Sequence, residues 1–128
     1  TSYNEDKPIF ILKKDQILIS VLPRDFSFVF EETLSRIYSL FAKYRIKVNL
    51  VQNSAINFSF CADEKSKDIY QMIEELRENY KVLYNRGLEL LTIRHYNEQI
   101  LKDAEDGRRI LVEQRSRHTA QFLMEPKI

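Results

Sequence analysis

The stretch IYSLFAKYRIKVNLVQNSAINFSF, residues 37–60, changes its hydrophobic period part-way along. Up to Arg45 its apolar residues recur every three or four positions, which predicts an amphipathic helix. After Arg45 apolar and polar residues alternate, which predicts two strands, 46–52 and 56–62, in a hairpin. The polar connection VQNSA, residues 51–55, is either a plain turn or part of a binding site.

Alternation also assigns the faces of these two strands, because successive side chains of a strand point to opposite sides. The residues expected on the buried faces are Val48 and Leu50 in the first strand and Ile56, Phe58 and Phe60 in the second. The segment 56–61 is also expected at an edge of the sheet, where unpaired backbone groups offer a place for a second subunit to pair.

The flanking segments complete one unit of an α+β fold. The predicted order of elements is strand 16–21, helix 34–44, strand 46–52, strand 56–62, helix 66–80 and strand 81–84. Ser66 can cap the second helix, and NRG at 85–87 predicts a turn in which Gly87 takes a positive φ. This β-α-β-β-α-β order is the ferredoxin-like arrangement, with two helices on one face of an antiparallel sheet.

The rest of the chain predicts an incomplete second unit. Its elements are a strand at 88–96, a short helix at 97–107 with Asn97 as its cap and Gly107 at its end, and a hairpin at 109–124. The apolar run IFILKK (9–14) can supply the missing strand from the other end of the chain. We therefore expect a contiguous domain at 16–86, nested in a discontinuous one made of 8–15 plus 87–125, with 1–7 as a linker.

The composition limits the class of protein. The 128 residues are 44% hydrophobic and 30% charged, which suits one ordinary globular domain or two small ones that share a core. The formal net charge of +1 gives no field that would attract nucleic acid or an anionic membrane. Neither a membrane-spanning run nor a secretory leader is present, so we expect a cytoplasmic protein with no nucleic-acid or membrane partner. Two glycines are too few for a glycine-rich phosphate loop.

Catalytic and metal-binding motifs are not evident in the sequence. Neither His95 nor His118 has the spacing of a metal site or a catalytic dyad. The lone Cys61 excludes an internal disulfide and is expected to be a small buried side chain rather than a reactive thiol. The basic residues near the C-terminus are Arg108, Arg109, Arg115, Arg117 and His118. We expect them to form a solvated edge or an ion-pair interface.

The segments ILKKDQILISV (11–21) and LSRIYSLFAKYRIKVNLVQNSAINFSFCAD (34–63) resemble the C-terminal regulatory region of aspartate kinases, which is a tandem of ACT domains. GLELLTIRHY (87–96) and RSRHTAQFLM (115–124) are similar to the second ACT unit of that region. The resemblance covers about residues 8–124 and implies the same nested layout of two ACT units.

The resemblance also implies a function. Such a region binds an end-product amino acid, typically lysine or threonine, at an interface between ACT units of a homodimer. Binding inhibits the first step of the aspartate pathway to lysine, threonine and methionine. The kinase domain, with its ATP and Mg²⁺, would lie upstream and be joined through residues 1–7, so this chain would catalyse nothing and hold no cofactor.

The resemblance gives two sets of candidate residues, in the loop regions where the family binds its effector and pairs its second unit. The implied effector-binding residues are Asp25, Phe26, Ser27, Thr33, Leu34, Asn49, Gln52, Asn53 and Ser54. The implied interface residues of the second unit are Ser116, His118 and Thr119. In a ferredoxin-like unit the loop after the first strand is expected near the second strand, which would bring 25–33 close to 49–54.

Three departures from the family pattern affect this site. EETL (31–34) stands where the family commonly has a Gly-Phe pair, and Glu31 and Glu32 would repel a ligand carboxylate. Asn49 replaces an aspartate that could hold an ammonium group, and NSA (53–55) replaces a TSE triplet. Two alternatives therefore stay open: a dimerisation module that has lost its effector, and a small enzyme of ferredoxin-like fold.

Overall fold

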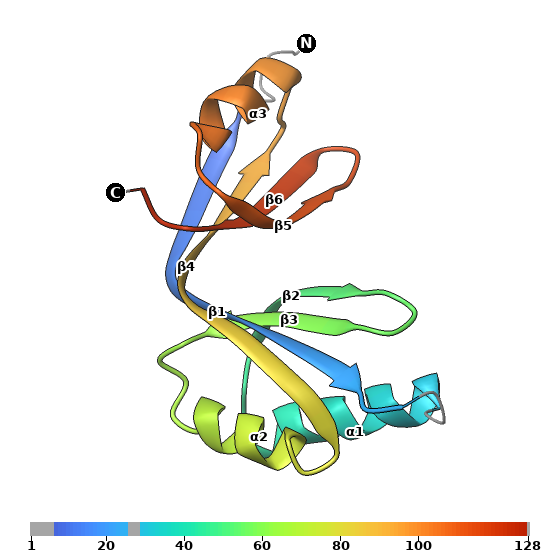
Figure 1. Ribbon diagram of the computed structural model, residues 1–128. Coiled ribbons are helices and arrows are strands. Elements are labelled where there is room, and N and C mark those ends of the chain that lie inside the picture. Colours follow the sequence, from blue (N-terminus) through green and yellow to red (C-terminus); the bar gives the residue numbers. More distant parts are fainter. Residues whose placement is uncertain (1–6, 26–28, 128) are drawn as a thin grey trace. The chain divides into compact units, whose positions relative to one another are not determined.

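The computed structural model describes residues 7–25 and 29–127, which divide into two units. The contiguous unit is Asp15–Arg86, and the discontinuous unit combines the described residues up to Lys14 with those from Gly87 onward. Two long strands, β1 (Ile9–Pro23) and β4 (Tyr80–Arg94), each run from one unit into the other (Figure 1). A boundary between the units therefore falls inside each of these strands.

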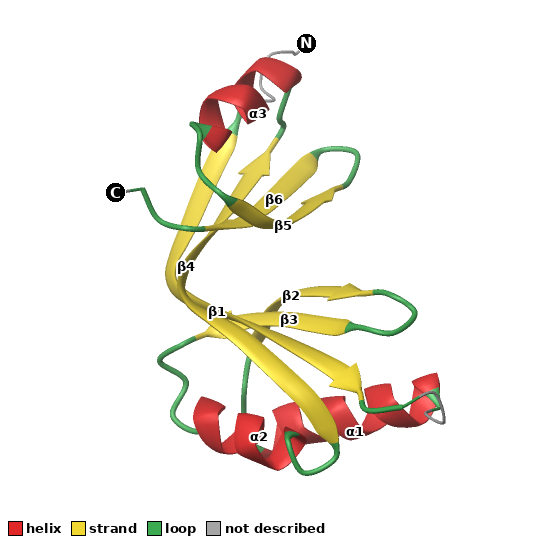
Figure 2. Ribbon diagram, in the orientation of Figure 1, coloured by secondary structure: helices red, strands yellow, loops and turns green. Residues whose placement is uncertain are grey.

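The contiguous unit is an antiparallel sheet with two helices on one face (Figure 2). Besides its parts of β1 and β4, it contains α1 (Phe30–Lys43), β2 (Val48–Asn53), β3 (Phe58–Asp63) and α2 (Ile69–Leu76). The strand order is β2-β3-β1-β4. The predicted α+β fold, with its ferredoxin-like β-α-β-β-α-β order, is confirmed.

Aromatic rings fill the layer between this sheet and its helices. Phe58 and Phe60 of β3 are fully buried, as the alternation predicted. The ring centroid of Phe60 lies 4.8 Å from that of Phe41 on α1, and Phe58 lies 5.1 Å from Phe30. The residues of α2 that close the same core are Ile69, Met72, Ile73 and Leu76. Burial of these faces, rather than helix propensity alone, stabilises the two helices.

The β2–β3 hairpin departs from simple alternation in two places. A bulge shifts the register between Val48 and Leu50. Val48 and Val51 consequently pack on the core under the helices, while Leu50 is buried elsewhere, so the prediction that Val48 and Leu50 share a face is wrong. Ile56 is 58% exposed because β3 begins only at Phe58, and its predicted place in the core is also wrong.

Two further predictions fail in the contiguous unit. β3 pairs with β1 on one side and β2 on the other, so the segment 56–61 is not an edge strand. α2 begins after Asp68, and no side-chain hydrogen bond caps it, so Ser66 is not its cap. Instead the Ser66 carbonyl accepts a hydrogen bond from the Ile69 amide at 3.2 Å, in a turn that leads into the helix.

β1 and β4 are each continuous where the sequence predicted an interruption. Asp15 (φ 56°) and Gly87 (φ 69°) adopt the left-handed conformation inside these strands. The predicted positive φ of Gly87 is therefore confirmed, but residues 85–87 belong to β4 and do not form a separate turn. One left-handed residue can kink a strand locally without ending its pairing.

The discontinuous unit has the strand order β1-β4-β6-β5. It adds α3 (Glu98–Glu105), β5 (Ile110–Arg115) and β6 (Thr119–Met124), which match the predicted short helix and hairpin. Its core consists of Ile93, Leu101, Ala120, Phe122 and Met124. Within 7–25 and 29–127, no helix is long and apolar enough to cross a membrane, and no three ligating side chains are grouped to hold a metal ion.

Asn97 caps α3 as the sequence predicted, because its side-chain oxygen accepts a hydrogen bond from the Ile100 amide at 2.9 Å. Replacing Asn97 with alanine leaves this amide unpaired at the helix start. We expect the free energy of unfolding, measured by urea denaturation, to fall by about 1 kcal/mol. Asn97→Ser keeps an accepting oxygen and is the control. An equal loss in both variants would show that the cap contributes little.

Candidate functional site

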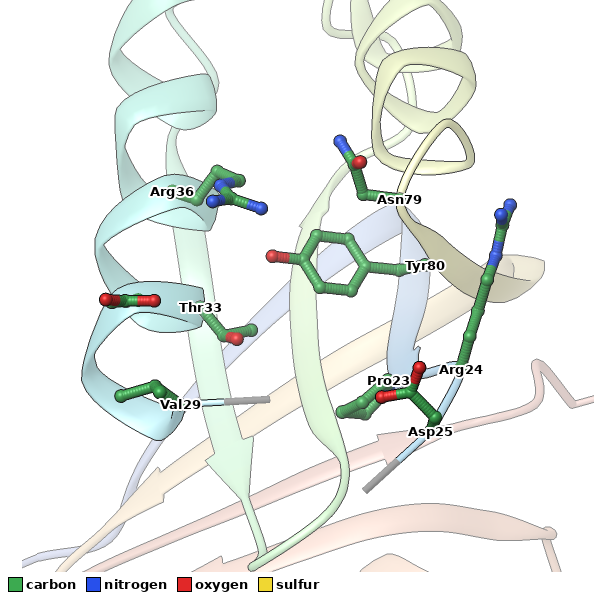
Figure 3. Close-up of a pocket in the computed structure, with 9 residues that line it drawn as sticks. Pro23, Arg24, Asp25, Val29, Thr33, Arg36, Asn79 and Tyr80 are labelled. Carbon is green, nitrogen blue, oxygen red and sulfur yellow. The ribbon is translucent and has the colours of Figure 1, made fainter. Parts of the chain in front are cut away.

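A polar cavity of about 290 Å³ lies in the contiguous unit, where β1 ends, α1 begins and β4 begins (Figure 3). Its lining residues are Pro23, Arg24, Asp25, Val29, Glu32, Thr33, Arg36, Asn79 and Tyr80. We call it the α1–β4 cavity. Its size suits a small metabolite rather than a nucleotide or a peptide.

Local structure explains how the lining residues come together. β1 ends at Pro23, whose ring nitrogen cannot donate to a sheet, and Arg24 and Asp25 follow at the rim. The first turn of α1 presents Thr33, whose amide donates to the Val29 carbonyl at 3.0 Å. Tyr80 opens β4 directly after the turn that ends α2.

Two buried hydroxyl groups face the α1–β4 cavity. Thr33 is 4% exposed and Tyr80 is 6% exposed. Figure 3 shows the Tyr80 hydroxyl pointing towards α1, in the direction of Thr33 and Arg36. Among the residues that the structure describes, neither side-chain hydroxyl has a hydrogen-bond partner. Buried polar groups are normally paired, so these two mark a place where a polar ligand atom would be stabilised.

The charges around the cavity are balanced. Arg24 and Arg36 bring two positive charges, and Asp25 and Glu32 bring two negative ones. The Arg24 guanidinium donates to the backbone carbonyl of Arg77. Arg36 makes no ion pair within 7–25 and 29–127. The arrangement can bind a small ligand that carries both an anionic and a cationic group.

The structure brings only part of the predicted effector set to this cavity. Asp25 and Thr33 line it, and Leu34 is half-buried against the core beside it. Phe26 and Ser27 lie outside the described residues. Their predicted role in effector binding stays a prediction.

The predicted residues of β2 lie away from the cavity. Gln52 and Asn53 are exposed at the end of β2, and Ser54 begins the loop, where its amide donates to the Asn57 carbonyl at 2.8 Å. Asn53 pairs with Phe58 of β3, so a whole strand separates it from β1. VQNSA is thus the end of β2 plus a hairpin turn.

Asn49 sits at the opposite end of the same sheet. Its side-chain amide donates to Gln16 at 2.9 Å and to Asp63 at 3.0 Å. Gln16 pairs with Asp63 in the middle of β1, whereas the cavity lies beyond Val21 at the end of that strand. The expectation that residues 25–33 lie close to Asn49 is therefore wrong, because β1 and β2 run in the same direction and separate the two positions along their length.

The lining residues that lie outside the predicted effector set include Arg36, Asn79 and Tyr80. The sequence placed Tyr80 at the end of the predicted helix 66–80, whereas it is the first residue of β4. A sign was available in the pair Asn79–Tyr80, since a polar residue and an amphipathic ring follow a helix there. Their approach to α1 depends on tertiary packing, which spacing along the chain does not reveal.

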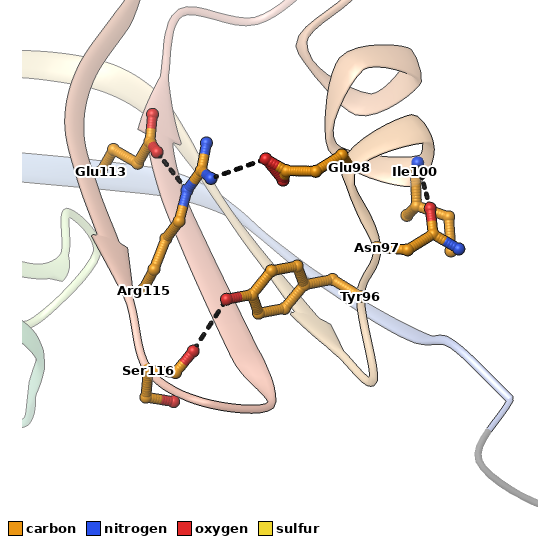
Figure 4. Close-up of polar contacts among 7 residues, drawn as sticks. All are labelled: Tyr96, Asn97, Glu98, Ile100, Glu113, Arg115 and Ser116. Atoms are coloured by element: carbon orange, nitrogen blue, oxygen red, sulfur yellow. Dashed lines mark hydrogen bonds and ion pairs between the residues drawn. The ribbon is translucent and has the colours of Figure 1, made fainter.

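The predicted interface residues form the β5–β6 turn. The Ser116 amide donates to the Thr119 carbonyl at 2.8 Å, and the His118 carbonyl accepts from the His95 amide at 2.6 Å. Figure 4 shows the Tyr96 hydroxyl donating to the Ser116 carbonyl, at 2.9 Å. These bonds explain the turn, and the interface role of Ser116, His118 and Thr119 stays a prediction.

Most of the basic group near the C-terminus is neutralised within the unit. Arg108 pairs with Glu89 at 2.6 Å and Arg109 with Glu125 at 3.5 Å. Arg115 contacts two carboxylates, those of Glu98 and Glu113, as Figure 4 shows. The glutamates also hold the pKa of Arg115 above its usual value, chiefly through the hydrogen bond that Arg115 donates to Glu113.

Solved structures of similar fold are aspartate kinases or their regulatory parts. No family model and no curated sequence matches this chain. A proposed C-terminal regulatory domain of aspartate kinase from Porphyromonas gingivalis superposes with a TM-score of 0.77 at 16% identity, over 94% of this chain and 88% of that one. The chain has the fold of an aspartate kinase regulatory domain. The resemblance seen in the sequence is thus confirmed at the level of the fold.

Two other aspartate kinase structures share this regulatory fold. The regulatory subunit from Thermus flavus gives a TM-score of 0.67 at 11% identity, over 91% of this chain and 86% of that one. E. coli aspartokinase III in complex with lysine and aspartate superposes with a TM-score of 0.69 at 18% identity, over 89% of this chain. This chain spans only 28% of the E. coli chain.

Proposed function

We propose that this chain is the regulatory part of an aspartate kinase and that it senses a small amino acid through the α1–β4 cavity. The fold is that of aspartate kinase regulatory domains. The observation that carries the proposal is the pair of buried, unpartnered hydroxyls of Thr33 and Tyr80 in a cavity with two charges of each sign. A zwitterionic metabolite would supply hydrogen-bond partners for the two hydroxyls and an anionic partner for Arg36.

Regulation then follows from differential binding. A ligand that binds one arrangement of the region more tightly than another shifts the population towards it, and only by that difference in affinity. We propose that the kinase domain, with ATP and Mg²⁺, belongs to another part of a longer cytoplasmic protein. Lysine is the first candidate effector, since the E. coli structure of this fold was solved with lysine and aspartate. Threonine is the second candidate, from the resemblance in the sequence.

One observation favours assembly as a second role. Four consecutive apolar residues of β1, Ile9, Phe10, Ile11 and Leu12, are each about half exposed. Exposed apolar strands commonly mark protein–protein contacts. A homodimer would cover them, and a chain that has lost its effector would still keep this surface.

The test of sensing is thermal unfolding of the chain with and without millimolar concentrations of each standard amino acid. A ligand at about 100 times its Kd adds about 2.7 kcal/mol to the stability. For a domain of this size we expect the melting temperature to rise by several degrees with one or a few amino acids. The control is the same amino acid of opposite chirality.

The opposite result is equally informative. If no amino acid shifts the melting temperature while the chain is dimeric by light scattering, the sensing role fails and the assembly role is supported. A shift of equal size for both enantiomers would indicate a general solute effect rather than a site.

A further inference from the structure

We propose that the α1–β4 cavity anchors a ligand carboxylate on side chains, through Arg36, Tyr80 and Thr33. This deepens the proposed function, on which it rests, by naming the group of the ligand that is bound and the residues that bind it. None of the residues that the family resemblance placed in the effector site on β2 takes part.

The first part of the anchor is the pair of buried hydroxyls. Each can donate one hydrogen bond, and a carboxylate has lone pairs for several. Thr33 and Tyr80 are both more than nine-tenths buried, and no described residue accepts from either hydroxyl. A carboxylate that replaces water in the cavity would be a charged acceptor for both hydroxyls, and hydrogen bonds to charged groups contribute about 1.5–3 kcal/mol.

The second part is the Arg36 guanidinium. Arg36 lies three residues after Thr33, so the two side chains share one face of α1. In Figure 3 its guanidinium lies on the side of α1 that faces Tyr80. Glu32, four residues before Arg36, makes no ion pair with it among the described residues. A guanidinium matches a carboxylate with two parallel hydrogen bonds.

The charge at the start of α1 favours these side chains over the helix backbone. A helix N-terminus attracts anions through its free amides. Here Glu31 and Glu32 occupy the first turn and place negative charge at that point. A carboxylate is therefore better stabilised further along α1, beside Arg36, while Asp25 and Glu32, which also line the cavity, suit an ammonium group.

The experiment measures Kd by titration calorimetry on the whole chain, first for the standard amino acids. The best binder is then compared with its α-carboxamide, which keeps every group except the carboxylate charge. Succinate is a third probe, with carboxylates but no ammonium group. We expect the amide to bind at least tenfold more weakly than the acid.

Two variants test the anchor residues. Arg36→Gln should weaken binding of the acid about tenfold to a hundredfold, and Tyr80→Phe about fivefold. Arg117→Gln and Tyr38→Phe, both exposed and outside the cavity, are the matched controls and should leave Kd unchanged.

The outcomes separate this inference from the proposed function. If an amino acid binds but its amide binds equally well, or if Arg36→Gln and Tyr80→Phe leave Kd unchanged, the anchor is wrong and sensing stands. If succinate alone binds and depends on Arg36, the anchor stands and amino-acid sensing fails. If no probe binds at millimolar concentration, both are overturned.

Discussion

Replacing Phe60 with alanine is expected to lower the free energy of unfolding by about 3–5 kcal/mol. Phe60 is 1% exposed on β3, which has a strand on either side. Its ring centroid lies 4.8 Å from that of Phe41 and 6.0 Å from that of Tyr38, and both pairs of rings are edge-on. The truncation therefore leaves a cavity that the surrounding rings cannot fill. The total free energy of unfolding of a domain is typically about 5–15 kcal/mol, so this loss is a large part of its stability.

The measurement is urea denaturation followed by circular dichroism, and Ile56→Ala is the control. Ile56 shares the alternation of Phe60 in the sequence but is exposed in the hairpin loop. We expect its removal to change stability by about 0.5 kcal/mol or less. A loss for Ile56→Ala as large as that for Phe60→Ala would place Ile56 in the core and contradict the structure.

Breaking the ion pair between Arg108 and Glu89 is expected to cost about 3 kcal/mol in the variant Arg108→Ala. The side chains are only 16% and 14% exposed, and their charged atoms are 2.6 Å apart. Arg108 also donates to the Glu125 carbonyl at 3.1 Å. Its removal leaves the Glu89 carboxylate largely buried without a partner, which is the costly half of breaking a buried pair.

Arg115→Ala is the matched control, since Arg115 also contacts carboxylates but is 38% exposed. Exposed pairs of this kind contribute about 0–1 kcal/mol. In addition, Glu89→Gln combined with Arg108→Met removes both charges and should regain much of the loss. Equal stability of Arg108→Ala and Arg115→Ala, again by urea denaturation, would show that burial of the pair is unimportant.

The order of elements could be predicted because each period in the sequence agrees with its local structure. The change from helix to strand at Arg45 and the alternation through Phe58 and Phe60 both survive in the fold. The errors arise where one residue alters the local geometry. The bulge beside Leu50 moves it off the face of Val48, and the left-handed Asp15 continues a strand that appeared to end.

The site was less predictable, because its parts are far apart in the chain. Thr33 and Tyr80 are 47 positions apart in the chain and line one cavity only because β4 begins beside α1. Asn49 shows the opposite error. Its residue type suggested a ligand contact, whereas its side chain is used by Gln16 and Asp63. Residue chemistry alone does not distinguish a binding amide from a structural one.

The shared strands β1 and β4 have a consequence for how the protein acquires its structure during synthesis. Residues 15–86 hold every strand and helix of the contiguous unit, so this unit can form once that segment has left the ribosome. The discontinuous unit needs residues up to Lys14 together with those from Gly87 onward, which are synthesised only after the whole contiguous unit. The apolar residues 9–12 therefore lack their partners in the discontinuous unit until the segment from Gly87 onward has been synthesised. During that interval this apolar strand would be exposed to chaperones.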